Sequence, residues 1–257
     1  MYNWPESFER EYEHFQMPKN LKNTLVLSDL HIPYHNVGAI EEAVNYGIQK
    51  KIDSILLNGD VVDCYMLSKF QPDPRERHFG EEIIAFQQFI KTLKGVFPGV
   101  KIFYKIGNHE ERYEKIMISR CSEFLGIPHF EFENVLGCRE LGIEVIKDQR
   151  IIYCGKLAVI HGHEVGMKAI NVNPARTLFL KTHVNALCSH LHRTSSHTEP
   201  SLHEDITCWS TGHLSEEHPK YARINKWNHG AARIEKDEEG NFEVINVNLK
   251  MNKLFMA

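Results

Sequence analysis

Apolar residues fall in short blocks along the chain. In the first half, compact apolar runs alternate with segments in which apolar residues recur at helical spacing. Compact apolar runs of strand length occupy 24–28, 52–57 and 100–106. Between them, 38–50 and 81–94 repeat apolar side chains at helical spacing. An alternation of strand and helix implies right-handed crossovers, so this half predicts a largely parallel sheet.

The second half has shorter apolar blocks separated by turn residues. One helix is predicted at 174–182. Strands are predicted at 144–147, 150–153, 156–160, 184–188, 194–199, 205–210, 229–235 and 242–249. The Cys154-Gly155 step indicates a hairpin, and the later strands are expected to be antiparallel. We therefore expect a single domain at 24–257 with two packed sheets.

Residues 1–23 form an extension ahead of this pattern. Phe8, Tyr12 and Phe15 recur at helical spacing, which predicts a short amphipathic helix over 6–15. The apolar face of such a helix needs a partner, so we expect the extension to pack on the core.

Two stretches, 64–80 and 212–228, lack a clear period. The first is rich in Pro, Arg and His, and the second is rich in His and Lys. Long irregular loops in a small domain commonly carry functional residues, so both are candidates for substrate contact.

Composition excludes several classes of protein. The chain has 257 residues, of which 42% are hydrophobic and 25% charged, as in globular proteins. Its net charge of -4 provides no overall basic field for nucleic acid. No apolar run approaches the roughly 20 residues of a membrane span, and the start of the chain lacks a signal-peptide pattern. The six cysteines form no C-x-x-C pair, which favours free thiols, a cytoplasmic location and no cysteine zinc site.

Five polar blocks follow predicted strands. They are Asp29–His31, Gly59–Asp63, Gly107–Glu110, His161–His163 and His190–His192. Ligands of α/β sheets bind outside the carboxyl ends of strands, where these blocks fall. Their carboxylate, imidazole and amide donors suit Mn²⁺, Fe or Zn²⁺ better than Ca²⁺. The joint pattern predicts a two-metal site, the type that hydrolyses phosphoesters.

The order and spacing of the blocks resemble the calcineurin-like metallophosphoesterase superfamily, whose pattern is D-x-H, G-D-x-x-D, G-N-H-[DE], H and G-H-x-H. The match covers about residues 24–192. The resemblance implies a four-layer αββα sandwich with two mixed β-sheets and two divalent metal ions near the strand ends. It also implies hydrolysis of phosphomonoesters or phosphodiesters by a hydroxide that bridges the metals. We expect Mn²⁺, with Fe or Zn²⁺ as alternatives.

The resemblance also assigns roles residue by residue. The first metal would be held by Asp29, His31, Asp60 and His192. The second would be held by Asp60, Asn108, His161 and His190, so that Asp60 bridges the two. His109 would be the general acid, and Asp63 would orient its imidazole by a hydrogen bond.

Two positions depart from the family pattern. Ser189 stands where the last block usually has glycine, and we expect this change to be tolerated because both histidines remain. Cys64-Tyr65 stands where the Ser/Thr protein phosphatase branch has Arg-Gly, whose arginine holds phosphate. This second departure disfavours a protein phosphatase.

Six further residues are candidates for contact with substrate, each of which also fits an ordinary surface or structural role. They are His35, Arg75, Arg77, His163, Arg176 and His213. The arginines are included because a guanidinium group matches phosphate bidentately.

Two rival functions remain open. A nuclease of the DNA-repair phosphoesterase type would need a local basic groove, for which the chain offers Arg75, Arg77, Lys220, Arg223 and Lys226. A non-catalytic protein-binding scaffold would keep the fold and commonly lose the acid or a ligand. The expected partner is a phosphorylated small molecule or a nucleic acid, with no membrane; the sequence indicates no oligomeric state.

Overall fold

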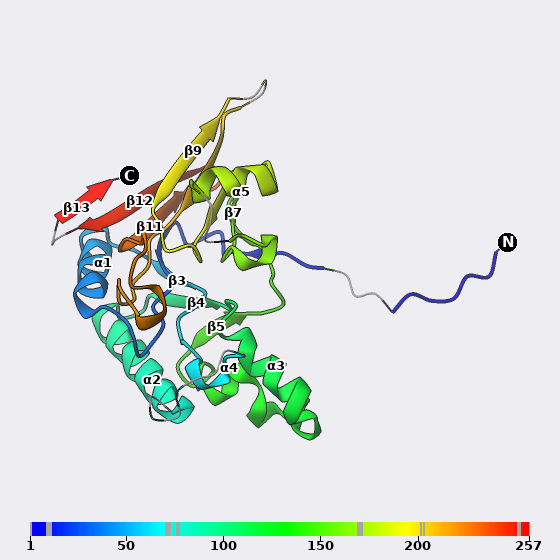
Figure 1. Ribbon diagram of the computed structural model, residues 1–257. Helices are drawn as coiled ribbons and strands as arrows, with labels where there is room; N and C mark the ends of the chain where they lie inside the picture. The colour runs from blue at the N-terminus through cyan, green and yellow to red at the C-terminus, as the bar shows by residue number, and fades with distance from the viewer. Residues whose placement is uncertain are drawn as a thin grey trace.

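Two mixed β-sheets pack face to face, and helices cover their outer faces (Figure 1). The computed structural model describes residues 2–8, 12–69, 73, 75, 78–168, 172–200, 202, 204–250 and 253–256. Helices α1 (Val37–Lys50) and α2 (Phe79–Val96) cover one sheet, and α5 (Pro174–Thr182) covers the other. The result is the four-layer αββα sandwich that the resemblance implied.

The seven-stranded sheet has the order β13-β12-β11-β2-β3-β4-β5. Its parallel strands are β2 (Asn23–Leu27), β3 (Ser54–Asn58), β4 (Lys101–Lys105) and β5 (Ile143–Ile146). Its antiparallel strands are β11 (Gly230–Lys236), β12 (Phe242–Lys250) and β13 (Lys253–Met256). The parallel half agrees with the sequence pattern, and β5 extends it, although we had grouped that strand with the second half of the chain.

The six-stranded sheet has the order β1-β6-β7-β8-β10-β9. Its strands are β1 (Phe15–Gln16), β6 (Ile152–Cys154), β7 (Leu157–Val159), β8 (Ala186–Cys188), β9 (Ser195–Glu199) and β10 (Ile206–Ser210). The predicted hairpin joins β6 to β7, and β9 pairs antiparallel with β10. Strand β8 is parallel to both β7 and β10, so the carboxyl ends of β7 and β8 lie at one edge.

Alternating side chains of each strand fill separate layers. Val26, Leu56 and Phe103 point between the sheets, where they meet Val159 and Leu187. The intervening residues of the parallel strands face α1 and α2 instead. Each such buried side chain contributes roughly 1.5–3 kcal/mol of hydrophobic stabilisation. This packing holds the parallel strand ends, and the loops that follow them, in fixed positions.

The connection from β4 to β5 contains short helices that the apolar pattern did not predict. They are α3 (Glu111–Arg120), η2 (Ser122–Phe124), η3 (Pro128–Phe130) and α4 (Phe132–Val135). Among the described residues of the aperiodic stretches, 64–80 has the 3₁₀ turn η1 (Tyr65–Leu67) and the start of α2, and 212–228 has the 3₁₀ turn η5 (Lys220–Ala222). A further 3₁₀ turn, η4 (His163–Val165), follows β7. None of the helices in the described part of the chain is long and apolar enough to cross a membrane.

The helix expected over 6–15 is wrong for the described residues of that stretch. Residues 6–8 and 12–14 are irregular, and Phe15 belongs to β1, which pairs with β6. Three backbone and side-chain contacts hold this segment: the Tyr12 hydroxyl donates to the Gln149 carbonyl, and Arg150 donates to the Glu13 and His14 carbonyls. Strand pairing therefore replaced helix formation here.

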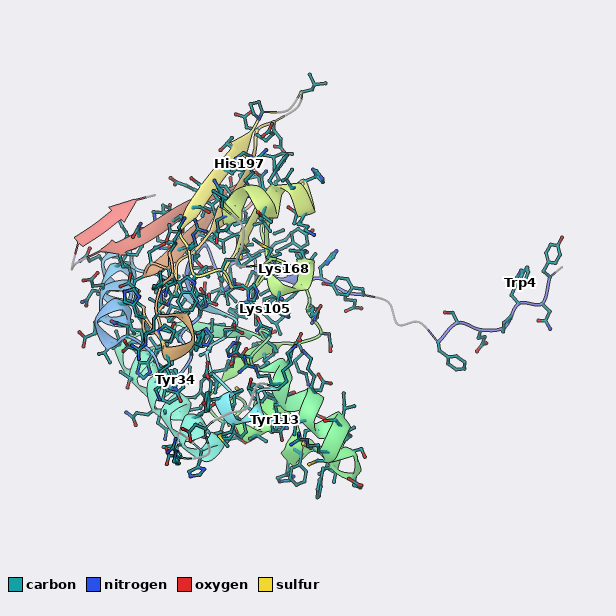
Figure 2. The ribbon with its side chains drawn as sticks, viewed as in Figure 1. Trp4, Tyr34, Lys105, Tyr113, Lys168 and His197 are labelled. Carbon is teal, nitrogen blue, oxygen red and sulfur yellow. The ribbon has the colours of Figure 1, made fainter. Side chains whose placement is uncertain are left out.

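Residues 2–8 extend away from the two sheets, as the position of Trp4 shows in Figure 2. Tyr2, Trp4 and Phe8 are exposed. The packing that we expected of the extension is thus made by residues 12–21, with Met17 and Leu21 buried against the inter-sheet core.

Candidate metal centre

The predicted ligands converge where strands of both sheets end. Asp29 and His31 follow β2, and Asp60 follows β3. His161 follows β7, and His190 and His192 follow β8. Their donor atoms form two groups, each with all atoms within 4.8 Å of one another. The first donor group is Asp29, His31 and His192; the second donor group is Asp60, His161 and His190.

In the first donor group, three donor atoms face one another in a buried space. His192 Nε2 lies 3.2 Å from Asp29 Oδ1 and 3.3 Å from His31 Nε2. The other nitrogen of His31, Nδ1, lies 2.8 Å from Asp63 Oδ1 and donates to it. A carboxylate that accepts from one ring nitrogen leaves the second nitrogen as a lone-pair donor, the usual arrangement of a metal-binding histidine.

The second donor group repeats this arrangement. Asp60 Oδ2 lies 3.3 Å from His161 Nε2, and His161 Nδ1 donates to the Asn58 carbonyl over 2.8 Å. The Oδ1 atom of Asn108 and the Nδ1 atom of His190 are buried and have no hydrogen-bond partner among the described residues. Leaving buried polar atoms unpaired is costly, so their presence points to a missing partner.

The donor set fits divalent transition-metal ions. It combines carboxylate oxygens, imidazole nitrogens and one amide oxygen, all at buried or half-buried positions. Burial by itself raises the pKa of the Asp60 carboxyl. The surrounding His109, His161 and His31 outweigh this effect and lower the pKa well below its ordinary value. Asp60 therefore offers an ionised carboxylate in the second donor group.

The backbone at these positions adopts a conformation that side chains rarely take. Five predicted ligands have positive φ values between 49° and 68°: Asp29, His31, Asp60, His190 and His192. A non-glycine residue in the left-handed region costs of order 1–2 kcal/mol. Such strain clusters at functional sites, where the surrounding structure imposes it. Here it turns consecutive side chains toward one point.

The Glu110 carboxylate fixes the loop that carries Asp60. Its two oxygens accept N–H groups from Asp60 (3.1 Å), Val61 (2.7 Å), Val62 (3.1 Å) and Gly107 (2.9 Å). The Tyr104 hydroxyl also donates to it, over 2.7 Å. One carboxylate thus joins the second and third polar blocks.

A buried ion pair holds the block that contains His161. Glu164 accepts from the His161 and Gly162 N–H groups at 3.0 and 2.6 Å, and Lys105 Nζ lies 2.9 Å from its Oε1. Lys105 is wholly buried in the middle of the molecule (Figure 2). Against the effect of burial, Lys105 lowers the pKa of Glu164 to about 2, so the Glu164 carboxylate is ionised at neutral pH.

The predicted acid and its orienting carboxylate lie beside both donor groups. His109 Nδ1 lies 2.8 Å from the Asp63 carbonyl and 3.1 Å from Asp63 Oδ1. His109 Nε2 faces Asp60 Oδ2 at 3.8 Å. Asp63 therefore contacts two imidazoles, those of His31 and His109, rather than the one that we expected.

Two of the candidate substrate residues, His213 and His163, lie beside predicted metal ligands. His213 stacks on His192 with ring centroids 4.9 Å apart, and the ring of His163 lies 6.3 Å from that of His190. His35 pairs with Ser215 in a backbone bridge.

The structure describes two of the three arginine candidates, and both are exposed. Arg75 is exposed and pairs with Asp73 at 2.8 Å. Arg176 is exposed on the first turn of α5, which packs on the outer face of the six-stranded sheet. Arg77 lies outside the described residues.

Sequence reasoning missed several residues that touch the centre. Glu110 and Glu164 shape its loops, and the Arg112 guanidinium lies 2.8 Å from His109 Nε2. The available signal was proximity, since Glu110 and Arg112 are within three residues of His109.

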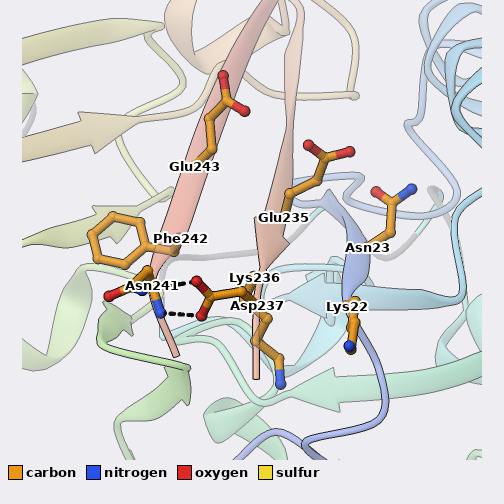
Figure 3. A pocket seen from close by; sticks show the side chains of 8 residues that line it. All are labelled: Lys22, Asn23, Glu235, Lys236, Asp237, Asn241, Phe242 and Glu243. Atoms are coloured by element: carbon orange, nitrogen blue, oxygen red, sulfur yellow. Dashed lines mark hydrogen bonds between the residues drawn. The ribbon is translucent and has the colours of Figure 1, made fainter. Parts of the chain in front are cut away.

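A separate open hollow lies at the turn between β11 and β12 (Figure 3). It is lined by Lys22, Asn23, Glu235, Lys236, Asp237, Asn241, Phe242 and Glu243. Asn241 donates to both Asp237 oxygens, which closes the turn (Figure 3). Its lining shares no residue with either donor group, so the chemistry lies elsewhere.

Gly59→Ala is expected to disrupt the second donor group. Gly59 has φ +82°, and a Cβ atom there would lie 2.4 Å from His161 Nδ1. The displaced imidazole should lower the metal content measured by plasma mass spectrometry by about one ion per chain relative to the wild type. Gly166→Ala is the control, because it adds the same left-handed strain (φ +65°) in open space. Equal metal content in both variants would contradict the steric argument.

Glu82 should make stability depend on pH. It is wholly buried on α2 and accepts the Tyr65 N–H over 3.1 Å. Burial, with Asp63 nearby, raises the pKa of Glu82 from 4.5 to about 7. The folded state therefore loses stability as the pH rises from 4.5 to 7, because the unfolded carboxyl ionises first.

Glu82→Gln keeps the acceptor oxygen and removes this titration. The difference in unfolding free energy between variant and wild type should grow with pH, by roughly 2–3 kcal/mol between about pH 4 and pH 8. Urea denaturation across that range measures it. A difference independent of pH would show that Glu82 is not the responsible group.

Comparison with known proteins gives one assignment and several distant likenesses. The Gene 54 protein of Mycobacterium phage L5 is 21% identical over 184 residues, which span 67% of this chain and 69% of that protein. A single mutant of Vps29 from Entamoeba histolytica has a TM-score of 0.46 and 11% identity over 91% of this chain and 97% of that chain. Yfce, a phosphoesterase from E. coli, has a TM-score of 0.44 and 14% identity over 90% of this chain and 96% of that chain.

A family profile matches most of the chain. The profile of the calcineurin-like phosphoesterase family matches residues 22–226. This range includes all five polar blocks and confirms the resemblance seen in their spacing. The chain therefore belongs to the calcineurin-like phosphoesterase family.

Proposed function

We propose that this protein is a binuclear metal-dependent phosphoesterase that hydrolyses phosphomonoesters or phosphodiesters. One observation carries the proposal: two groups of buried donor atoms face each other at the strand ends without enough partners of their own. Family membership alone would not distinguish an enzyme from a scaffold with the same fold. The intact donor groups favour the enzyme, because a scaffold has no need to maintain strained, buried ligands.

Most of the residues at the centre would bind the two cations. Asp29, His31 and His192 would hold one cation, and His161 and His190 the other. Asp60 would bridge the two, and the unpartnered Asn108 oxygen would complete the second position. When bound, the two cations would supply a nucleophile at neutral pH and offset charge on the phosphoryl oxygens.

His109 is the proposed general acid. Its Nε2 atom faces the Asp60 carboxylate of the second donor group at 3.8 Å. Asp63 holds the opposite nitrogen through two oxygens, which fixes the orientation of the ring. A positioned acid of this kind contributes on the order of 10²–10⁴-fold to the rate.

Hydrolysis of p-nitrophenyl phosphate and bis-p-nitrophenyl phosphate with added Mn²⁺ tests the proposal. We expect turnover that chelation abolishes and Mn²⁺ restores. Asp60→Asn should lose both metal ions and all turnover, because it removes the shared carboxylate. Asp148→Asn is the matched control: Asp148 is an exposed aspartate with a similar φ of 59°. Two fully occupied metal positions in Asp60→Asn, seen by anomalous scattering, would contradict the bridging role.

His109→Ala should separate binding from chemistry. We expect wild-type metal content and a fall in kcat of about 10²–10⁴-fold, because the acid is lost while the ligands remain. His129→Ala removes an exposed histidine on η3 and should leave kcat unchanged. Wild-type turnover of His109→Ala on several leaving groups would refute the acid assignment.

The rival functions give different results in the same assays. A scaffold would hydrolyse neither substrate in the presence of Mn²⁺. A nuclease would cleave DNA or RNA with affinity that falls steeply as salt rises. The exposed Lys220, Arg223 and Lys226 of the loop before β11 are the side chains through which it would bind.

A further inference from the structure

Arg112 joins the two polar blocks that carry the proposed acid chemistry. It is half-buried on the first turn of α3, three residues after His109. Its Nη2 atom lies 2.8 Å from His109 Nε2, and its Nη1 atom donates to the Asp63 carbonyl over 3.0 Å. The guanidinium group therefore lies beside the atom that faces the donor groups.

The contact with Arg112 determines which nitrogen of His109 carries the proton. A guanidinium group only donates hydrogen bonds, so His109 Nε2 must accept. The Nδ1 atom lies 2.8 and 3.1 Å from two oxygens of Asp63, both acceptors, and therefore holds the hydrogen. In this arrangement Nε2 has no proton to give to a leaving group. Arg112 thus occupies the position that substrate must reach.

The location also provides a cationic side chain where the second block has none. Asp29, Asp60 and Asp63 lie at the centre, and Cys64-Tyr65 supplies no cation after the second block. Arg112 Nη1 lies 3.5 Å from the Cys64 carbonyl, against the backbone of that same step. A guanidinium group there can bind a phosphoryl group bidentately.

The loop that carries η5 lies beside the same centre. The ring of Trp227 packs edge-on against His192 with centroids 4.3 Å apart, and the ring of Tyr221 lies 6.2 Å from that of Trp227.

We propose that Arg112 is a substrate-contacting residue that confers preference for phosphomonoesters. On binding, its guanidinium group exchanges His109 Nε2 for a terminal phosphoryl oxygen. The freed Nε2 takes up a proton from solvent, and this proton passes to the leaving oxygen when the ester bond breaks. A monoester has three terminal oxygens, whereas a diester has two. If two of these oxygens face the two donor groups, only the monoester keeps a third oxygen for Arg112. The inference rests on the proposed function and specifies its substrate class.

The test compares Arg112→Met and Arg112→Lys with wild type, loaded with Mn²⁺. Arg120→Met, an exposed arginine on the last turn of α3, is the control. For Arg112→Met we expect kcat/KM for p-nitrophenyl phosphate to fall about 10²–10³-fold, and that for bis-p-nitrophenyl phosphate less than about tenfold. Arg112→Lys should recover part of the loss, because it restores charge but not the bidentate fork. Metal content should be unchanged in all variants.

Calorimetry measures the affinity for inorganic phosphate without the need for turnover. Arg112→Met should weaken this affinity at least about tenfold. If phosphate affinity stays at the wild-type value while both substrates lose rate equally, Arg112 only positions His109 and the proposal is overturned. Unchanged kinetics would overturn it too. If wild type binds phosphate through Arg112 but hydrolyses neither substrate, the contact stands and the proposed phosphoesterase function fails.

Discussion

The carboxylate of Glu110 is the constraint on which the candidate centre depends. It is buried, and it receives N–H groups from the loops that follow two adjacent strands, β3 and β4. A buried charge is tolerable only where donors surround it, and removing it would leave those backbone groups unpaired. Because the same side chain holds both loops, the positions of Asp60 and Asn108 are fixed relative to each other. The loops that carry these two residues are also fixed relative to strands β3 and β4.

The ligands also share a left-handed backbone. Asp29 and His31 both take positive φ values, and their side chains meet in the first donor group. Glycine would adopt this conformation freely but provides no donor atom. Glycine stands instead at Gly59, where the His161 ring passes so close that a Cβ atom would not fit. The five ligand positions keep their donor atoms at the cost of backbone strain.

Period and spacing predicted the parts of the molecule that depend on local sequence. The periodic helices α1 and α2 and the parallel strands were found this way, because burial imposes their patterns. The spacing of the polar blocks also led to side chains that the structure gathers into the two donor groups. Contacts between residues far apart in the sequence were not predicted. Phe15 fitted a helical repeat, yet it pairs with Ile152 across the sheet. Arg112 carried no recognisable pattern, because its role arises only when α3 turns it back toward His109.

Both donor groups take ligands from both sheets. Asp29, His31 and Asp60 follow strands of the seven-stranded sheet, whereas His161, His190 and His192 follow strands of the six-stranded sheet. A cation bound in either group would therefore cross-link the two layers, much as a disulfide links two segments. Separation of the layers would require its release, so its binding free energy would add to the cohesion of the sandwich.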